Sequence, residues 1–241
     1  FLNKKDLPYC VIHAPELYED EHILDLCSND INVTRRSLNE LQKVIDYSNQ
    51  ILSEINSQKS IGIVTNVGGH SSDSFLPKED KKHLPNRLME NLNKLELGNA
   101  EIWPQTMPPY PWHFGGQRFH NLFVDPNEII CLSKKFNMKL CLDISHTQLA
   151  CNSLGINLPD ILEELLECSA HLHIADADMI NGEGLQIDKG CMNFLKIMNI
   201  IRKRDHDSNN LKLSWIPEIW QGHENQGSGF RVALNHLCEY L

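Results

Sequence analysis

The chain has 241 residues, of which 41% are hydrophobic, and its 32 acidic against 22 basic residues give a formal net charge of −10. This length suits one large α/β domain or two small ones with a substantial core. No apolar run approaches the roughly 18 residues that a membrane span needs, and no segment resembles a signal peptide. The basic residues form short scattered clusters, not the basic face typical of nucleic-acid binders. We therefore expect neither a membrane nor a nucleic acid as a partner.

The cysteines show no CxxC pair and no regular spacing, and several stand in apolar stretches, as in Leu-Cys141-Leu. In a chain of this length they indicate buried free thiols in a cytoplasmic protein, not a disulfide framework. Together with the negative charge, this favours a cytoplasmic enzyme that acts on a small molecule.

Short apolar runs alternate with helical stretches along the chain. The segment Leu38–Ile55, for example, has apolar residues at positions 38, 41, 44, 45, 51, 52 and 55, which is a helical period. In chain order we predict strand Tyr9–His13, helix Leu38–Ile55, strand Ser60–Thr65, helix Lys78–Leu97, strand Ala100–Gln105, helix Pro126–Phe136, strand Lys139–Asp143, helix Leu158–Cys168, strand Ala170–Asp176, helix Cys191–Lys203, strand Leu213–Glu218 and helix Gly229–Tyr240.

Repeated strand–helix alternation predicts a parallel sheet in an α/β fold. An open doubly wound sheet usually carries a glycine-rich phosphate turn after its first strand, and this chain has none there. A (β/α)8 TIM barrel fits better, because polar residues follow the strands where the βα loops of a barrel converge. Six strands do not close such a barrel. We therefore expect residues 1–241 to form a single domain that is incomplete at its N-terminus and lacks two strands upstream of Phe1.

Three strand ends carry residues that bind metals. Asp143 ends one predicted strand, His173 lies in the next and Glu218 ends the last. A strand-end Asp is most often a helix N-cap, and a lone His in an apolar strand is often a core residue. Three such residues at the same end of consecutive parallel strands can instead meet around one divalent cation such as Zn, Mn or Co. We expect one bound metal ion.

At this point the sequence resembles a known family. Cys141-Leu-Asp-Ile-Ser-His146, His173-Ile-Ala-Asp176, Gly182-Glu-Gly184, Pro217-Glu-Ile-Trp220 and the early His13-Ala-Pro15 are similar to successive motifs of the xylose-isomerase-like TIM barrels. That superfamily includes sugar-phosphate isomerases and epimerases and the endonuclease-IV-type repair nucleases. The order of the motifs covers nearly the whole chain, and it implies that the six predicted strands are the third to eighth of the barrel.

The resemblance implies a metal held by a glutamate on the fifth strand together with Asp143, His173 and Glu218. Here Gln105 stands in the position of that glutamate, and Glu101 lies four residues deeper in the strand. A glutamine can bind a cation through its carbonyl oxygen, but it cannot act as a general base. The family's epimerases use two opposed glutamates, so this substitution breaks the catalytic pair. We expect Glu218 to move the proton, with His146 or His13 as the alternative base.

The nuclease branch of the family fits less well. Its additional zinc ions need a further strand-end histidine where this chain has Thr65-Asn66, and an Asp-x-His pair where this chain offers Asp176, Asp178 and Glu183. Ligands for two of three metal ions are therefore missing.

The segment Met107–His120 is rich in proline and aromatic residues. It is either a stiff crossover that packs its aromatics on the barrel or a substrate cover in which aromatic faces stack on a sugar ring. In the second interpretation the substrate-binding residues are Trp112, Phe114, Gln117, Arg118 and His120, joined by Asp176, Glu183 and His223.

This loop and the run Glu218-Ile-Trp-Gln-Gly-His223 are also similar to barrel domains of nonulosonic (sialic-type) acid synthesis proteins. Two functions follow. The first is a divalent-metal-dependent isomerase or epimerase of a sugar or sugar phosphate. The second is a catalytically impaired, sugar-binding accessory domain that is fused to or associated with a larger synthase.

Overall fold

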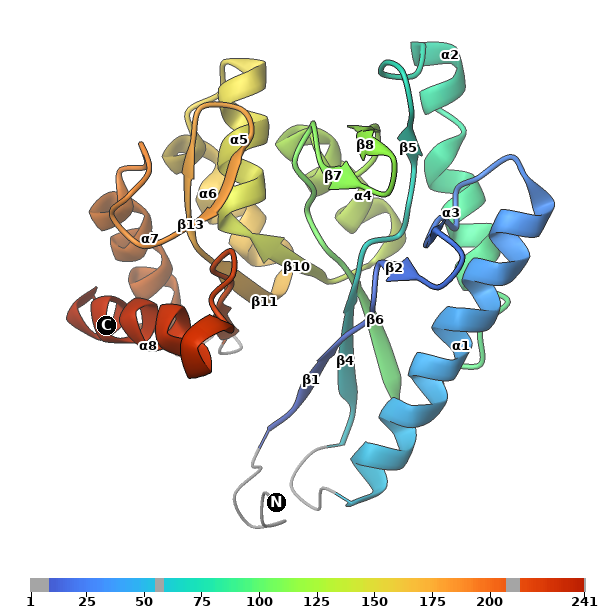
Figure 1. The fold of residues 1–241 in the computed structure, drawn as a ribbon, viewed down its shortest axis with the longest axis horizontal. Helices are drawn as coiled ribbons and strands as arrows, with labels where there is room; N and C mark the ends of the chain where they lie inside the picture. The colour runs from blue at the N-terminus through green and yellow to red at the C-terminus, as the bar shows by residue number, and fades with distance from the viewer. Residues whose placement is uncertain (1–8, 55–58, 207–212, 241) are drawn as a thin grey trace. The chain divides into compact units, whose positions relative to one another are not determined.

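The structure is a computed structural model that describes residues 9–54, 59–206 and 213–240. The chain forms two compact units (Figure 1). The first unit contains the described residues up to Gln105 together with Trp112–Leu122, and the second contains Thr106–Pro111 and the described residues from Phe123 onward. The structure defines each unit by itself. Within the described residues no helix is both long and apolar enough to cross a membrane.

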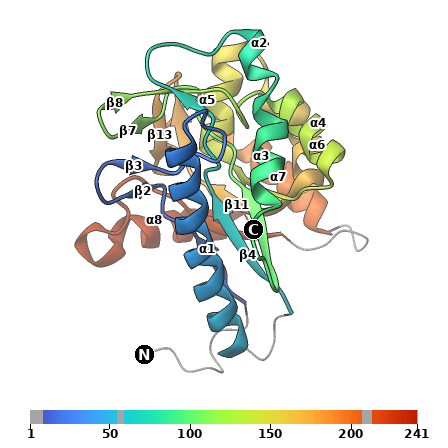
Figure 2. The same ribbon diagram turned by 90° about the vertical axis from the view of Figure 1, so that its right-hand side faces the viewer.

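The first unit is built on a parallel sheet of three strands in the order β1 (Val11–His13), β4 (Ile61–Thr65) and β6 (Ala100–Pro104). Every residue of β4 is buried because it is the central strand. The long helix α1 (Ile31–Glu54) packs on β4 and β6 (Figure 2), and its buried residues include Leu41, Ile45 and Leu52. Gly62 has no side chain because the ring of Trp103 occupies that space, 2.1 Å from where a Cβ would stand.

Shorter elements surround this sheet. They are the helices α2 (Lys78–Lys81) and α3 (Leu84–Leu92) and the antiparallel pairs β2 (Leu17–Tyr18) with β3 (His22–Ile23), β5 (His70–Ser71) with β9 (Phe119–His120), and β7 (Trp112–His113) with β8 (Gly116–Gln117).

The second unit repeats the α/β pattern. Its parallel sheet has the order β10 (Leu140–Asp143), β11 (Ser169–Ile174) and β14 (Ser214–Pro217), and the antiparallel pair β12 (Asp176–Asp178) and β13 (Gly182–Leu185) follows β11. The helices are α4 (Pro126–Phe136), α5 (Ile144–Leu154), α6 (Leu158–Cys168), α7 (Phe194–His206) and α8 (Glu224–Tyr240). The fully buried side chains Leu140, Leu142, Leu165 and Leu172 belong to its core.

The six predicted strands are present and parallel within the two sheets, and α4 and α6 have the predicted bounds. The other helix predictions are corrected, and α7 spans Phe194–His206 where the prediction was Cys191–Lys203. The predicted helix Lys78–Leu97 is two helices that end at Leu92, because Pro85 lacks the N–H that a continuous helix would need there. Helix α1 begins at Ile31, where Asp30 accepts the amide of Asn32, and its predicted end, Ile55, lies outside the described residues. Helix α5 was not predicted.

Helix α8 starts earlier than the predicted Gly229, but residues 225–227 have left-handed backbone angles that separate a first turn from the rest. The cysteines are free, as predicted. The expectation that they are buried is wrong for Cys131, Cys191 and Cys238, which are exposed. In α4 and α8 the helical period carries one cysteine each to the solvent side.

Candidate metal centre

The second unit brings three predicted ligands to the carboxyl ends of its parallel strands. Asp143 ends β10 and stands opposite His173 of β11 in the register of the sheet. His173 in turn stands opposite Ile216 of β14, and Glu218 follows that strand directly. The amide of Glu218 donates to the carbonyl of Ile174 over 3.1 Å, which extends the pairing to the ligand position. Parallel register therefore places the three side chains at one edge of the sheet.

The ligand atoms of these residues converge. His173 Nδ1 lies 3.8 Å from Asp143 Oδ2 and pairs with Glu218 Oε2. The side chains of Asp143 and His173 are almost fully buried, whereas 42% of the Glu218 side chain is exposed. One imidazole nitrogen carries at most one proton, so it can donate to only one of the two carboxylates. Two carboxylates and one imidazole nitrogen thus meet at this edge of the sheet.

Threonine hydroxyls fix the backbone of Asp143. The amide of Asp143 donates to Thr106 Oγ1 over 2.9 Å, and Thr147 Oγ1 donates to the carbonyl of Asp143 over 2.6 Å. The two hydroxyls also lie within 3.0 Å of each other. These threonines were not predicted as part of the site. The position of Thr106 directly after Gln105 was the available signal.

Asp143 is also the N-cap of α5, since its Oδ1 accepts the amide of His146 over 2.8 Å. This leaves Oδ2 toward the imidazoles, 3.5 Å from His146 Nδ1 and 3.8 Å from His173 Nδ1. His146 Nδ1 lies 3.0 Å from the carbonyl oxygen of Thr106, so this nitrogen carries a proton. Its other nitrogen, Nε2, lies 3.7 Å from Glu183 Oε2.

The charges of this cluster are strongly coupled. The pKa of Asp143 is raised to about 8, because burial and the charge of Glu218, which raise it, outweigh the charge of His146, which lowers it. Burial also raises the pKa of Glu218, but the hydrogen bond and charge of His173 outweigh burial and hold the pKa of Glu218 below its usual range. Burial lowers the pKa of His146, but Asp143 and the neighbouring carboxylates outweigh it and raise this pKa to about 9.

His171 lies behind His173, as the two-residue period of a strand predicts. Their rings meet edge to face with centroids 5.2 Å apart, and His171 Nδ1 lies 2.7 Å from Ser214 Oγ. The hydrogen bond to Ser214 thus holds the His171 ring against the ring of His173.

The donor set suits a divalent transition metal. Two carboxylates and one imidazole nitrogen are ligands of the kind that Zn²⁺, Mn²⁺ and Co²⁺ accept. A cation between Asp143 and Glu218 would also offset the cost of burying the first carboxylate, which its raised pKa expresses. Asp143, His173 and Glu218 would hold the ion, and a fit of this kind needs no rearrangement of the strands.

The first unit holds His13 and Gln105 together. His13 Nε2 lies 3.1 Å from Gln105 Oε1, and His13 Nδ1 lies 2.8 Å from the carbonyl oxygen of Ala14. Because that carbonyl can only accept, Nδ1 carries a proton. The Gln105 amide can face Nε2 with either its oxygen or its NH2 group. Gln105 is 1% exposed, whereas Glu101 is exposed and faces Trp103 Nε1 at 3.4 Å.

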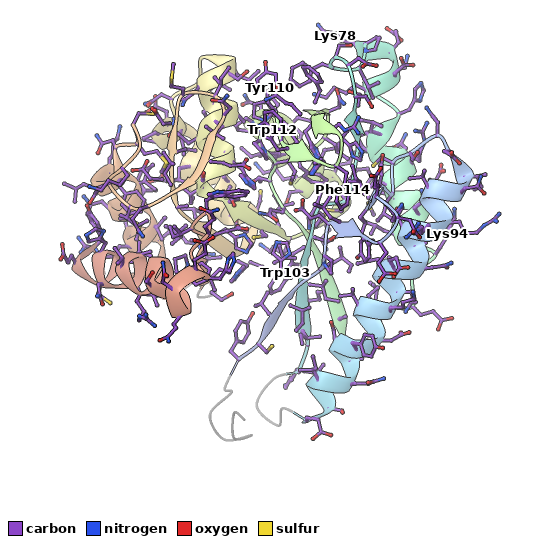
Figure 3. The ribbon with its side chains drawn as sticks, in the orientation of Figure 1. Lys78, Lys94, Trp103, Tyr110, Trp112 and Phe114 are labelled. Atoms are coloured by element: carbon purple, nitrogen blue, oxygen red, sulfur yellow. The ribbon has the colours of Figure 1, made fainter. Side chains whose placement is uncertain are left out.

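The other predicted substrate residues of the first unit lie on its short antiparallel strands. Trp112 and Phe114 stand at the β7–β8 hairpin, exposed by 64% and 36% (Figure 3). Gln117 and Arg118 are half-buried, and His120 is buried with Nε2 3.5 Å from Asn66 Nδ2. The hairpin thus presents two large aromatic faces to solvent.

Three predicted substrate residues lie in the second unit. Glu183 on β13 joins the metal cluster through His146, and His223 is exposed. Asp176 is fully buried and accepts the amides of Ala177 (2.8 Å), Gly190 (2.9 Å) and Met192 (3.4 Å). The carboxylate of Asp176 therefore anchors the loop after β13, and its role in binding a substrate stays a prediction.

Polar side chains at the carboxyl ends of the parallel strands of an α/β chain are typical of the class of TIM-barrel proteins, whose βα loops converge there. Residues 1–238 match the family described as xylose isomerase-like TIM barrel, and the chain belongs to this family. The predicted fold class is confirmed. No curated protein sequence matches the chain.

Solved structures with this fold include a D-tagatose 3-epimerase-like protein (20% identity, TM-score 0.63, 95% of this chain and 76% of that one). An L-ribulose 3-epimerase is similar at 12% identity (TM-score 0.64, 96% and 74%). Endonuclease IV from Thermus thermophilus is similar at 16% identity (TM-score 0.55, 95% and 76%). At these identities the likeness is one of fold.

Proposed function

We propose that this chain is a divalent-metal-dependent isomerase or epimerase of a sugar or sugar phosphate. The observation that carries the proposal is the convergence of Asp143, His173 and Glu218 at neighbouring strand ends, with His173 Nδ1 facing both carboxylates. The names of structures with the same fold support the substrate class, since they include D-tagatose, L-ribulose and D-allulose 3-epimerases. Ketoses are therefore the first substrates to test.

Each residue of the centre has a proposed role. The metal, when bound, polarises a carbonyl and a hydroxyl of the sugar so that the C–H between them becomes acidic. Asp143 and His173 hold the ion from buried positions. Glu218 is more exposed, so its second oxygen can reach a substrate and take or return a proton at the acidified carbon.

His146 is the second proton carrier of the proposal. Its Nδ1 is occupied by the carbonyl of Thr106, which directs Nε2 toward Glu183 at 3.7 Å. The ring can therefore exchange a proton only through Nε2. Thr106 and Thr147 hold Asp143, and thereby the start of α5 that carries His146.

The decisive experiment measures metal and chemistry separately. Protein purified without chelator is analysed for bound metal, and its exchange of substrate hydrogen for deuterium at C3 of D-allulose, D-tagatose and L-ribulose is followed in D2O. We expect about one metal ion per chain, with exchange that stops on Glu218→Gln. Full metal content in His173→Ala would show that the ion binds elsewhere. Absence of exchange with every ketose and ketose phosphate would remove the enzymatic proposal.

A second candidate function is a sugar-binding accessory domain without turnover. Gln105 favours it, because this residue is buried, contacts His13 and cannot act as a base where the family pattern has a glutamate. Saturable binding of a ketose without deuterium exchange, in protein with a full metal site, would select this candidate. In this second function the domain would be fused to a larger synthase or associated with one.

A further inference from the structure

Three histidine rings of the first unit form a cluster that the metal centre does not use. His70 lies on β5, His113 on β7 and His120 on β9. Their ring centroids are 5.7 Å (His70–His113), 6.0 Å (His70–His120) and 6.2 Å (His113–His120) apart. The pairing of β5 with β9 thus brings His70 to His120, and His113 lies seven residues before His120 in the chain.

Polar atoms of this cluster are buried without partners. His70 Nδ1 and His113 Nε2 have no hydrogen bond to any residue that the structure describes. The nearest carboxylate oxygen to His70 Nδ1 is Asp25 Oδ2 at 4.0 Å, too far for a hydrogen bond. A buried polar atom without a partner costs about 1–3 kcal/mol. Atoms of this kind are rare in native structures, and two on neighbouring rings point to a missing ligand.

Arg118 adds a third such atom and a permanent charge. Its Nε is buried with no hydrogen bond to the described part of the chain, whereas its terminal nitrogens donate to Ser72 Oγ (2.5 Å) and to the carbonyl of Phe114 (2.8 Å). The turn of the β7–β8 hairpin has a glycine where this side chain comes close. Gly115 has φ 79°, and a Cβ there would stand 3.1 Å from Arg118 Nη2. The guanidinium is therefore held in place before any ligand binds.

The charges decide the sign of the ligand. Burial and the charge of Arg118 lower the pKa of His70 to about 4, and burial, His70 and Arg118 lower the pKa of His113 to about 4. Both rings are neutral at pH 7, and each can present one N–H. A divalent cation would meet repulsion from Arg118. An anion would instead receive charge-assisted hydrogen bonds.

We propose that His70, His113 and Arg118 form a binding site for a phosphate-type oxyanion. His70 Nδ1, His113 Nε2 and Arg118 Nε supply the three donors, and His120 packs against both imidazoles. The buried carboxylate of Asp25 makes no hydrogen bond to these donors, because its Oδ2 lies 4.0 Å from His70 Nδ1. Its Oδ1 accepts the amides of Cys27 (2.8 Å) and Gly69 (2.9 Å), and burial raises its pKa to about 6. The site goes beyond the proposed function and rests on the first unit alone.

The test uses the full chain and inorganic phosphate. Ring resonances of isotope-labelled histidines are recorded by NMR at pH 7 during titration with phosphate, at ionic strength held constant with chloride. We expect saturable shifts of His70 and His113 in the unaltered protein. Arg118→Met should weaken binding about tenfold or more, the effect of losing one charge-assisted hydrogen bond. The control Arg231→Met removes the same charge from α8 of the other unit and should leave phosphate binding unchanged.

A second variant keeps the charge. Arg118→Lys lacks the planar fork, so we expect binding between those of the unaltered protein and Arg118→Met. Circular dichroism and the resonances of the metal-centre histidines report whether each variant is folded. Shifts that chloride alone reproduces, or phosphate affinity that Arg118→Met leaves unchanged in folded protein, would overturn the site. A further outcome concerns the charge of the ligand. If the protein binds one Zn²⁺ and His113→Gln abolishes this binding while His173→Ala does not, the ligand of the cluster is a cation and not an anion. The metal proposal survives a failure of phosphate binding, because none of these residues belongs to it, whereas Zn²⁺ binding of that kind would also assign the metal ion to the histidine cluster.

Discussion

Asp143 uses its two carboxylate oxygens for different partners. Oδ1 caps helix α5, and Oδ2 faces the imidazoles of His146 and His173. The sequence allowed either an N-cap or a metal ligand at this position, and the geometry accommodates both uses in one side chain. A capped carboxylate also has less rotational freedom to lose when it binds an ion. The helix therefore helps to organise the ligand.

Gln105→Glu tests whether this position touches the ion. A carboxylate in place of the amide adds a negative charge, and contact of this position with the ion should make Mn²⁺ or Zn²⁺ bind about tenfold more tightly or better. Paired metal titrations of the two forms by calorimetry give the ratio. Gln50→Glu, on the exposed face of α1, adds the same charge away from the site and should not change the affinity. Equal affinity in all three proteins would place Gln105 away from the ion.

Thr106→Val tests the support of Asp143. The substitution keeps the shape of the side chain but removes the hydroxyl that accepts the amide of Asp143. An unsatisfied buried amide costs about 1–3 kcal/mol in the free energy of unfolding, and we expect weaker metal binding as well. Thr34→Val is the matched control, since Thr34 Oγ1 donates to Ser28 on the other unit over 3.1 Å. The control should lose stability without losing metal affinity; the opposite pattern would contradict the supporting role of Thr106.

Burial of His70 should make the free energy of unfolding decrease as the pH falls. Its pKa falls from 6.5 to about 4 on folding because the side chain is buried beside Arg118. The unfolded chain therefore binds more protons between these values, and stability that is complete above pH 6.5 is lost as the pH falls toward 4. From pH 6.5 to 5 the loss is about 1 kcal/mol, after solvent screening of a nominal ~2 kcal/mol.

The measurement is a comparison of urea unfolding at pH 7 and pH 5 for the unaltered protein and His70→Gln. We expect the variant to lose less stability on acidification, by about the same 1 kcal/mol. Using the difference removes the contributions of groups that titrate in both proteins. An equal loss in the two proteins would show that His70 titrates normally in the folded state.

At the scale of elements, the signals at the two ends of a helix determined whether its bounds were predicted correctly. Helix α4 matches its prediction because strong signals mark both ends: Asp125 and Pro126 at the start and Asn137, which is left-handed with φ 49°, at the end. Helix α5 was missed, although Asp143 caps its start and Gly155 ends it in the left-handed conformation. The strand-end motif hid its first turn, since Asp143 was interpreted as a metal ligand and His146 as a candidate base. The α2–α3 break follows from Pro85 alone.

Asp125→Ala should lower the free energy of unfolding by about 1 kcal/mol, the usual effect of losing an N-cap. The carboxylate of Asp125 accepts the amide of Asn127 over 2.9 Å, and alanine cannot replace that bond. Asp160→Ala is the control. Asp160 lies in the first turn of α6, where it makes an exposed pair with Lys196 at 3.9 Å, so we expect a much smaller effect. Urea unfolding measures both; equal losses would indicate that the cap contributes nothing beyond charge.

At the scale of the whole molecule, the candidate metal site was more predictable than the histidine cluster. Asp143, His173 and Glu218 stand at the ends of successive strands, and strand register brings such residues together in any parallel sheet. His70 and His113 lie on two-residue strands whose pairing has no periodic signal in the sequence. Local pattern therefore predicts what regular elements position, and misses what irregular segments assemble over long sequence distances.

The last prediction concerns the coupling of metal binding to stability. An ion that binds the folded chain stabilises it by about 2.7 kcal/mol at roughly 100 times its Kd, provided that the unfolded chain does not bind it. The proposed ligands all belong to the second unit. Mn²⁺ or Zn²⁺ should therefore slow amide hydrogen exchange in β10, β11 and α5 before it affects the sheet of β1, β4 and β6. Chelator should reverse the effect.

Two histidine variants locate the coupling. His173→Ala should abolish the metal-dependent protection, whereas His83→Ala, an exposed residue at the start of α3, should keep it. Hydrogen exchange read by mass spectrometry distinguishes the two units, because the strands of the two sheets come from different stretches of the chain and so give different peptides. Protection of the β1–β4–β6 sheet alone would assign the ion to the first unit, near His13 and Gln105. Protection of both sheets to the same extent would instead mean that one ion stabilises both units, and Gln105→Glu would then enlarge the effect in both.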